Sequence, residues 1–261
     1  MIRALWASAN GMTGQQTNVD IIANNLANVN TSGFKAKSLQ FEDLMYQTER
    51  APGGTLADGS NTPTGLQVGY GSRPIASVTS FSPGDLKSTG APLDVAIEGK
   101  GFFRVTLPDG TFGYTRDGQF TLNAEGLMVT TTGYQLDGVG QIDTNATDVS
   151  IGKSGSLSVV VDGAIQALAP ITLATFPNPE GLRSAGNNLF LETEASGAAT
   201  TGITPGEQGT GTIAQGFLEG SNVRVVEEMV RLIQAQRAYE INSKSIQSSD
   251  EMLSLVNSLK R

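Results

Sequence analysis

The residues of this chain that could carry chemistry are carboxylates, because its 261 residues include no histidine and no cysteine. The sequence therefore excludes disulfides, thiolate metal sites and the nucleophile–base pairs that depend on either residue. Asp94 and Glu98 have the residue types of a glycosidase pair, in which two carboxyl groups flank the bond to be broken. They lie close together on one predicted strand, which is a weak case, and we expect no catalytic role for them.

Other sequence features that resemble chemical sites have simpler explanations. Four aspartates each precede a glycine: Asp109, Asp117, Asp137 and Asp162. Asp-Gly accepts the positive φ of a tight hairpin turn, so turn formation explains them. Residues 152–154, Gly-Lys-Ser, resemble the end of a phosphate-binding loop, but Thr147 occupies the position of the leading glycine. We therefore predict no enzyme, no cofactor and no metal site.

Composition and charge exclude further classes of protein. The chain has 32 Gly and 10 Pro, and only 16% of its residues are charged, which fits short strands and turns better than a helical bundle. Its net charge is −8 and it has no basic cluster, which argues against binding nucleic acid. No run of about 20 apolar residues is present, so we expect no membrane insertion.

The two ends of the chain must position whatever lies between them, and each has an apolar repeat of seven residues. The repeats comprise Leu5, Met12, Val19 and Leu26 near the N-terminus, and Val225, Leu232, Tyr239, Ile246 and Leu253 near the C-terminus. A repeat of this period keeps one narrow stripe of a helix facing a partner helix. We predict that these residues form a helical assembly interface, in which the terminal helices pair with each other or with copies of themselves.

Ordinary amphipathic helices packed on a globular core are the alternative interpretation of these repeats. The stripes are narrow and flanked by Asn, Gln and Ser, which makes a large sheet a poor partner. Gly11 and Gly14 also lie inside the first helix, where each costs about 1 kcal/mol relative to Ala. Both details favour the assembly interpretation.

The middle of the chain has the pattern of strands. Residues 93–97 and 103–107 alternate so that the large apolar residues lie on one face, and Asp-Gly turns follow at short spacing. The predicted fold class is α+β, with paired N- and C-terminal helices in a coiled-coil-like core that carries an inserted antiparallel β-domain. We divide the chain into a terminal helical domain of residues 1–35 and 221–261, a connecting segment of 36–67 and a β-rich outer domain of 68–220.

Two local features accompany this division, a long segment without periodicity and a predicted helix cap. Residues 47–67 have no periodicity, which predicts a long loop that is either a linker or a functional insertion. Ser221 and Asn222 precede the last helix and are predicted to cap its N-terminus.

Three motifs resemble those of the bacterial flagellar axial proteins, the family of rod and hook subunits. The first is Ala-Asn-Asn-Leu-Ala-Asn-Val at residues 23–29, followed by Gly-Phe-Lys at 33–35. The second spans 94–103 and 114–118, and the third spans 236–244. The residues that carry the terminal signatures are Asn24, Asn25, Leu26, Asn28, Gly33, Phe34, Gln236, Arg237, Tyr239 and Asn242.

The resemblance covers nearly the whole chain, and the length and the segment after Tyr46 favour the distal rod branch of the family. It implies a structural subunit that self-assembles into a straight hollow drive shaft and transmits torque from motor to hook. The implied partners are copies of itself, proximal rod subunits, hook subunits, the ring proteins around the rod and the flagellar type III export apparatus. The implied location is the basal body, where the rod crosses the periplasm, reached without a cleaved signal peptide.

Two other functions stay open at this point. One is another flagellar axial role, in the proximal rod or the hook. The other is a secreted carbohydrate-binding β-module with a helical stalk. Sugar-binding modules usually expose several aromatic side chains for stacking on sugar rings, whereas the single tryptophan of this chain, Trp6, lies in the predicted first helix.

Overall fold

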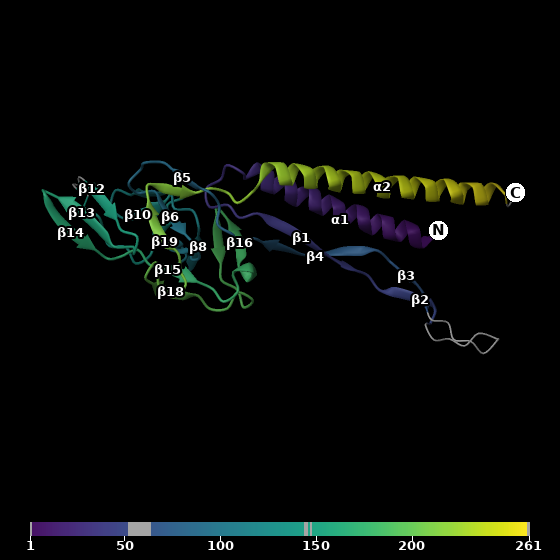
Figure 1. Ribbon diagram of the computed structural model, residues 1–261, viewed down its shortest axis with the longest axis horizontal. Helices are drawn as coiled ribbons and strands as arrows, with labels where there is room; N and C mark the ends of the chain where they lie inside the picture. The colour runs from purple at the N-terminus through teal and green to yellow at the C-terminus, as the bar shows by residue number, and fades with distance from the viewer. Residues whose placement is uncertain (1, 52–63, 144–145, 147, 260–261) are drawn as a thin grey trace. The chain divides into compact units, whose positions relative to one another are not determined.

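The computed structural model describes residues 2–51, 64–143, 146 and 148–259 (Figure 1). By their contacts the residues form two compact units. We call the first the helical unit; it comprises Met1–Leu26, Lys37–Val78 and Arg224–Arg261. The second, the β unit, comprises Ala27–Ala36 and Thr79–Val223. These two units differ from the three domains predicted from the sequence. The three-domain division stays a prediction about which residues share a function.

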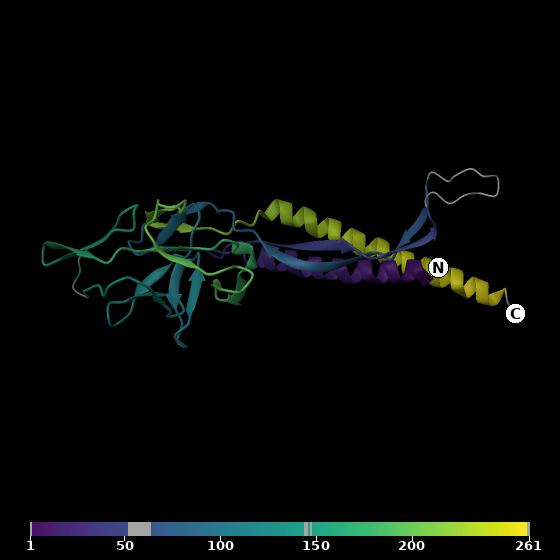
Figure 2. The same ribbon diagram turned by 90° about the horizontal axis from the view of Figure 1, so that it is seen from below.

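The helical unit contains two helices, α1 (Ile2–Ala27) and α2 (Val225–Ser258), where the seven-residue repeats predicted them. They lie side by side and run in opposite directions (Figures 1 and 2). The predicted cap of α2 is wrong. The residue before the helix is Arg224, whose side chain makes no capping hydrogen bond, while the Asn222 side chain instead accepts a hydrogen bond from the backbone N–H of Ala36 within the β unit.

A two-stranded ribbon completes the helical unit. Each arm of the ribbon is interrupted once. The first arm contains β1 (Lys37–Asp43) and β2 (Tyr46–Arg50), and the second contains β3 (Leu66–Gly69) and β4 (Ser72–Thr79). β1 pairs with β4 and β2 pairs with β3. The two pairs are joined by hydrogen bonds between backbone groups, from Leu44 N to Gly71 O at 2.8 Å and from Tyr70 N to Met45 O at 3.3 Å.

The prediction of a patternless loop at 47–67 is therefore wrong at both ends of the segment, where β2 and β3 pair. Every residue of β2 is exposed, so the strand has no buried face that could produce an alternating pattern. Residues 52–63, with Pro52, Leu56, Asp58 and Pro63, lie outside the described residues.

The β unit holds antiparallel strands, so the predicted α+β class is confirmed. Its largest sheet has the strand order β16 (Arg183–Gly186), β17 (Leu189–Leu191), β8 (Phe112–Thr115), β7 (Phe103–Thr106), β11 (Gln135–Leu136), β10 (Met128–Thr130) and β9 (Phe120–Leu122). A three-stranded sheet has the order β12 (Asp148–Ile151), β13 (Leu157–Val161) and β14 (Ala164–Leu168).

Three further ladders and one short 3-10 helix complete the described part of the β unit. The ladders pair β5 (Leu86–Ser88) with β20 (Phe217–Glu219), β6 (Val95–Glu98) with β19 (Thr212–Gln215), and β15 (Leu173–Thr175) with β18 (Thr200–Ile203). The 3-10 helix is η1 (Pro179–Gly181). The predicted Asp-Gly turn chemistry is confirmed at Asp162, between β13 and β14, which has a positive φ of 50°. It is wrong at Asp117, because neither Asp117 nor Gly118 is among the residues with positive φ.

The core of the β unit follows from alternation along its strands. In β7 the side chains of Phe103 and Val105 are fully buried, while the residues between and after them are half-buried. Phe103 meets Phe120 edge to face, with ring centroids 5.3 Å apart. A second cluster gathers the aromatic side chains of Phe102, Tyr114, Phe176 and Phe190. These clusters bury many large apolar residues of the unit within a single chain, whereas Phe112 and Ile165 stay exposed.

Candidate assembly interface

The seam between α1 and α2 is made of small and polar side chains. The Ser8 hydroxyl donates a hydrogen bond to the Ser245 hydroxyl, with 3.1 Å between the oxygens. A Cβ atom on Gly11 would lie 2.8 Å from Nδ2 of Asn242, so a side chain there would overlap the opposite helix. Gly11 thus lowers helix propensity but allows the close approach of two helices.

Asn25 is the polar centre at one end of this seam and is only 1% exposed. Its Nδ2 donates to the carbonyl of Lys37 at 2.8 Å and to Oε2 of Glu228 at 3.2 Å, and its Oδ1 accepts from the N–H of Lys37 at 2.9 Å. Oε1 of Glu228 accepts from Nη1 of Arg231 at 3.1 Å. One amide side chain therefore joins α1, β1 and α2 with both of its polar atoms satisfied.

A different face of α1 packs against the ribbon. A Cβ atom on Gly14 would lie 2.8 Å from Cε1 of Phe41 in β1. Arg3 forms an ion pair with Glu49 in β2. The two glycines that weaken α1 as an isolated helix therefore serve two different contacts, one with α2 and one with the ribbon.

The predicted interface residues lie beside the seam rather than in it. Half-buried members are Leu5, Met12, Val19, Leu26, Leu232, Ile246 and Leu253. Val225 and Tyr239 are each 40% exposed. The seam uses a second seven-residue set, displaced by three positions, that comprises Glu228, Ala235, Asn242 and Ser249. Because these residues are small or polar, an apolar pattern does not detect them. The role of the apolar repeat in assembly stays a prediction.

Two groups of apolar side chains on α2 face solvent. The first, which we call the leading patch, is Val226, Met229, Val230 and Ile233, with exposed fractions of 74, 52, 49 and 50%. The second, the trailing patch, is Met252, Leu255, Val256 and the C-cap residue Leu259, which follows the last residue of α2; their exposed fractions are 49, 61, 53 and 81%. Contiguous exposed apolar surface of this kind marks an interaction site.

The β unit contains a buried charge cluster that the sequence interpretation missed. Nζ of Lys35 lies 2.6 Å from Oε1 of Glu219, and Nη1 of Arg116 lies 3.3 Å from Oε2 of the same carboxylate. The side chains of these three residues are at most 2% exposed. Lys35 also donates to the carbonyl of Ser82 at 2.8 Å, and the Arg116 guanidinium lies over the ring of Phe102 at 5.3 Å.

Burial governs the electrostatics of this cluster. It lowers the pKa of Lys35 and of Arg116, because a charged group loses its hydration, while the Glu219 carboxylate acts in the opposite direction on both. Lys35 lies in the motif at residues 33–35 and Arg116 in the motif at 114–118. These two motifs were the signal in the sequence that could have pointed to the cluster. Their common partner could not be read from spacing, since Lys35 and Glu219 are 184 positions apart.

The carboxylates considered for catalysis do not converge. Asp94 is buried and accepts a hydrogen bond from the Thr89 hydroxyl, whereas Glu98 is exposed at the far end of β6. Asp109 organises its own turn by accepting from the N–H of Thr111 at 3.0 Å. Within the described ranges, no cluster of acidic residues is arranged to hold a metal ion.

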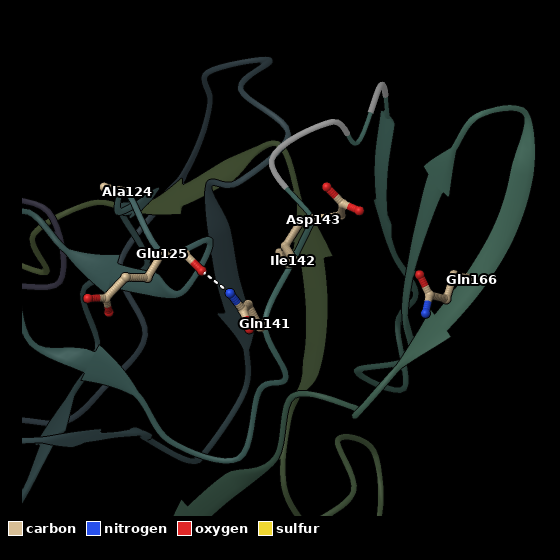
Figure 3. Close-up of a pocket in the computed structure, with 6 residues that line it drawn as sticks. All are labelled: Ala124, Glu125, Gln141, Ile142, Asp143 and Gln166. Atoms are coloured by element: carbon tan, nitrogen blue, oxygen red, sulfur yellow. Dashed lines mark hydrogen bonds between the residues drawn. The ribbon is translucent and has the colours of Figure 1, made fainter.

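One polar pocket lies in the β unit (Figure 3). It is lined by Ala124, Glu125, Gln141, Ile142, Asp143 and Gln166. The amide of Gln141 donates to the backbone carbonyl of Glu125, and the carboxylates of Glu125 and Asp143 point apart (Figure 3). The lining therefore offers no converging pair of ionisable groups, and the pocket is not a candidate for catalysis.

Comparison with protein families matches three parts of the chain. The model for flagella basal body rod protein matches residues 5–35, that for the D1 domain of flagellar hook protein FlgE/F/G matches 96–159, and that for the C-terminal part of flagellar basal body rod FlgEFG protein matches 214–259. These matches cover α1, part of the β unit, and α2 with the strands that precede it.

Relatives match over the full length. Flagellar basal-body rod protein FlgG of Buchnera aphidicola subsp. Acyrthosiphon pisum is 49% identical over 99% of this chain and 100% of the relative. FlgG of Borreliella burgdorferi is 48% identical and FlgG of Bacillus subtilis 42% identical, each over 100% of both chains. The chain belongs to the flagellar basal-body rod protein family.

Within this family the chain is a structural subunit of the distal rod and works in the basal body of the flagellum. The FlgG relatives named above are 42–49% identical, whereas FlgF of Caulobacter vibrioides is 37% identical over 97% of the chain. In the part of the chain that the structure describes, no helix is both long enough and apolar enough to cross a membrane.

The N-terminal signature of the rod family contains residues with different structural roles. In the helical unit, Asn25 lies in the seam, Leu26 is half-buried and Asn24 is exposed. In the β unit, Oδ1 of Asn28 accepts from the Thr31 hydroxyl at 3.1 Å. The signature is therefore not a single contact surface.

The end of this signature forms a turn that only glycine fits. Gly33 has a φ of 68°, and a Cβ atom there would lie 2.6 Å from the backbone N of Asp117. Its N–H donates to the carbonyl of Glu219 at 2.8 Å. Phe34, which follows, is half-buried. Glycine at this position lets the segment Ala27–Ala36 pack closely on the backbone at Asp117, and Lys35 then reaches its buried partner Glu219.

The C-terminal signature divides in the same way. Asn242 faces Gly11 across the seam. Gln236 and Arg237 are exposed, and Tyr239 is 40% exposed. The C-terminal signature therefore contains both a residue that contacts α1 within the chain and residues that are exposed in the single chain.

Proposed function

We propose that the chain builds the distal rod by polymerising with copies of itself through its terminal helices, into a straight hollow drive shaft that transmits torque from motor to hook. The observation that supports this is the exposed apolar surface of α2. Val226, Ile241 and Leu255 are 74, 67 and 61% exposed although α1 packs against the same helix. A single chain leaves this surface in water, and neighbouring copies would bury it.

The interface includes the apolar repeats. Its proposed residues are Leu5, Met12, Val19, Leu26, Val225, Leu232, Tyr239, Ile246 and Leu253. None of them is fully buried in the single chain, so each has surface left to lose on assembly. Seven-residue spacing suits this role, because it keeps one stripe facing a partner helix along its whole length.

Other flagellar proteins must adjoin such a polymer. The partners are proximal rod subunits, hook subunits, the surrounding ring proteins and the type III export apparatus. The role is mechanical and involves no catalysis, in keeping with relatives that are named as rod proteins. In this function residues 1–35 and 221–261 supply the helical core, 36–67 a rod-specific connection, and 68–220 the outer layer.

The part of the ribbon that lies within this connection, which includes β1 and β2, stiffens the polymer. Both faces of β2 are exposed, so its side chains are available to a neighbouring copy. A deletion of residues 48–65 is expected to leave assembly intact and to shorten the persistence length of the polymers, measured from micrographs. Polymers of equal stiffness would assign the segment to a simple linker.

The experiment that tests self-assembly compares Leu232→Asp with Gln247→Asp, a matched change at an exposed polar position of α2. The first places a charge where burial is expected, so polymers seen by sedimentation and electron microscopy should be lost. The melting temperature of the β unit should not change. A lack of polymers from the unaltered chain, or unimpaired assembly of Leu232→Asp, would contradict the proposal.

A further inference from the structure

The leading and trailing patches of α2 have the same design. Each places four apolar residues at positions i, i+3, i+4 and i+7, so that they lie on one face of two helical turns. The patches are 26 positions apart, which corresponds to about 39 Å along a helix that rises 1.5 Å per residue. They are therefore two matched surfaces at opposite ends of one helix.

Neither patch is covered by α1. Val226 and Ile233 each lie two positions before a seam residue, Glu228 and Ala235 respectively, and two positions correspond to about 200° around a helix. The leading patch thus faces away from α1. The face of α2 that contacts α1 and the face that carries the leading patch are therefore different.

The trailing patch is uncovered for a different reason. Because Ser8 lies opposite Ser245 and Gly11 opposite Asn242, each step along α1 matches one step back along α2. The first residue of α1, Ile2, therefore lies at the level of residue 251. The trailing patch begins with the next residue, where α2 continues past α1 (Figures 1 and 2).

The surface between the patches is not apolar. The exposed side chains there include Arg237, Glu240 and Lys244, with Ile241 as an apolar exception. An apolar partner that slid along the helix would have to desolvate these charges. Only the two ends of α2 offer a good fit to a partner with the same spacing of apolar residues.

We propose that the leading patch of one copy docks on the trailing patch of the next copy, head to tail. The partner is a second copy, because the chain is a rod subunit and a contact between two different patches leaves one patch free at each end, which lets a filament grow. A contact of each patch with itself would instead close into a pair. The inference rests on the self-assembly proposed above and identifies the surfaces that make one of its contacts.

Two charged variants test the docking. The leading-patch variant carries Val226→Asp and Ile233→Asp, and the trailing-patch variant carries Leu255→Lys and Leu259→Lys. At Val226 and Leu255, in the first and last turns of α2, the new charges match the helix dipole, and all four replaced side chains are half or more exposed. Circular dichroism should therefore show that the helix is retained. Matched controls are Gln234→Asp and Gln247→Lys at exposed polar positions of the same helix.

Sedimentation of each variant alone and of an equimolar mixture gives the result. Each variant alone should stay monomeric, because one of the two patches in every contact is charged. The mixture should associate, since the intact trailing patch of one variant meets the intact leading patch of the other. Controls should polymerise like the unaltered chain.

The outcomes against the inference are distinct from those against self-assembly. Polymers or dimers from either variant alone, or a mixture that stays monomeric, would overturn head-to-tail docking. Polymers of the unaltered chain in the same experiment would still support self-assembly. If the unaltered chain forms no polymers, self-assembly itself is wrong and the docking inference is wrong with it.

Discussion

The two units of this protein bury different kinds of side chain. In the β unit the fully buried positions include large apolar residues such as Ile97, Phe103 and Leu173. In the helical unit the seam buries Ser8 and Asn25, while large apolar side chains of α2 face solvent. The β unit has removed two clusters of large apolar side chains from water within one chain, although Ile165 stays 79% exposed. The helical unit keeps apolar surface that an assembly can bury.

The polar seam has a consequence for specificity. Hydroxyl and amide groups pair only where donor meets acceptor, so they set the register between α1 and α2 more strictly than apolar contacts would. The helices are thereby aligned without using the surface left for neighbours. The buried charge cluster of the β unit restricts the choice of partners even more strongly, because its ions have no access to water and must pair with each other.

The largest effect on this comparison is expected from Glu219→Gln in the β unit. It removes the only anion that the described structure pairs with Lys35 and Arg116 in the cluster and leaves two buried cations. Loss of one partner of a buried ion pair costs about 3–5 kcal/mol in the free energy of unfolding. Denaturant unfolding of the β unit measures it, with Glu98→Gln at an exposed position as the control.

An unchanged midpoint for Glu219→Gln would mean that the cluster adds nothing to the stability of the β unit. The contrast between this fully buried charge cluster and the hydroxyl and amide contacts of the seam would then lose its basis.

A smaller effect is expected from Asn25→Ala in the helical unit. The change leaves Glu228 and the backbone of Lys37 without their amide partner, at a cost of about 1–3 kcal/mol. Hydrogen exchange in the first turns of α2 should become faster, while unfolding of the β unit stays the same. Gln16→Ala, at an exposed position of α1, is the matched control. A loss of β-unit stability would show that the seam does not act within the helical unit alone.

The smallest effect is expected from Asp117→Asn. Burial raises the pKa of the Asp117 carboxyl above its ordinary value of 3.8, and the charge of Asp94 adds to the rise. Between 3.8 and the raised pKa the folded chain binds a proton that the unfolded chain does not, so stability falls as pH rises through this window. The asparagine keeps an oxygen for the N–H of Gln119 but carries no charge.

The Asp117→Asn variant should therefore melt at a slightly higher temperature than the unaltered chain above this window. Below pH 3.8 the two should melt alike, because both side chains are then neutral. Thermal unfolding at pH values on either side of the window measures the difference. A variant that is less stable at neutral pH would show that the carboxylate contributes more through its hydrogen bonds than burial costs it.

Sequence patterns predicted those elements whose side chains alternate in polarity. The repeats located α1 and α2, alternation located β6 and β7, and Asp-Gly located the turn at Asp162. The same reasoning missed β2 and β3, because an exposed ribbon has no buried face to mark. It also took Gly11 and Gly14 only as costs, because the contacts that favour them lie on other elements.

The sequence by itself determined the terminal helices, the β-rich middle and the family, since periodicity, turn chemistry and motifs are all local properties of the chain. Only the tertiary structure decided that the segment Ala27–Ala36, with Gly33 and Lys35, belongs to the β unit. It also decided that the seam between α1 and α2 is polar and that both ends of α2 are left uncovered. The physical reason is the range of the interactions. The buried ion pair between Lys35 and Glu219, and the hydrogen bond from the Asn25 amide to the Glu228 carboxylate, each join residues about 200 positions apart. Neither contact leaves an apolar pattern in the two segments that it joins.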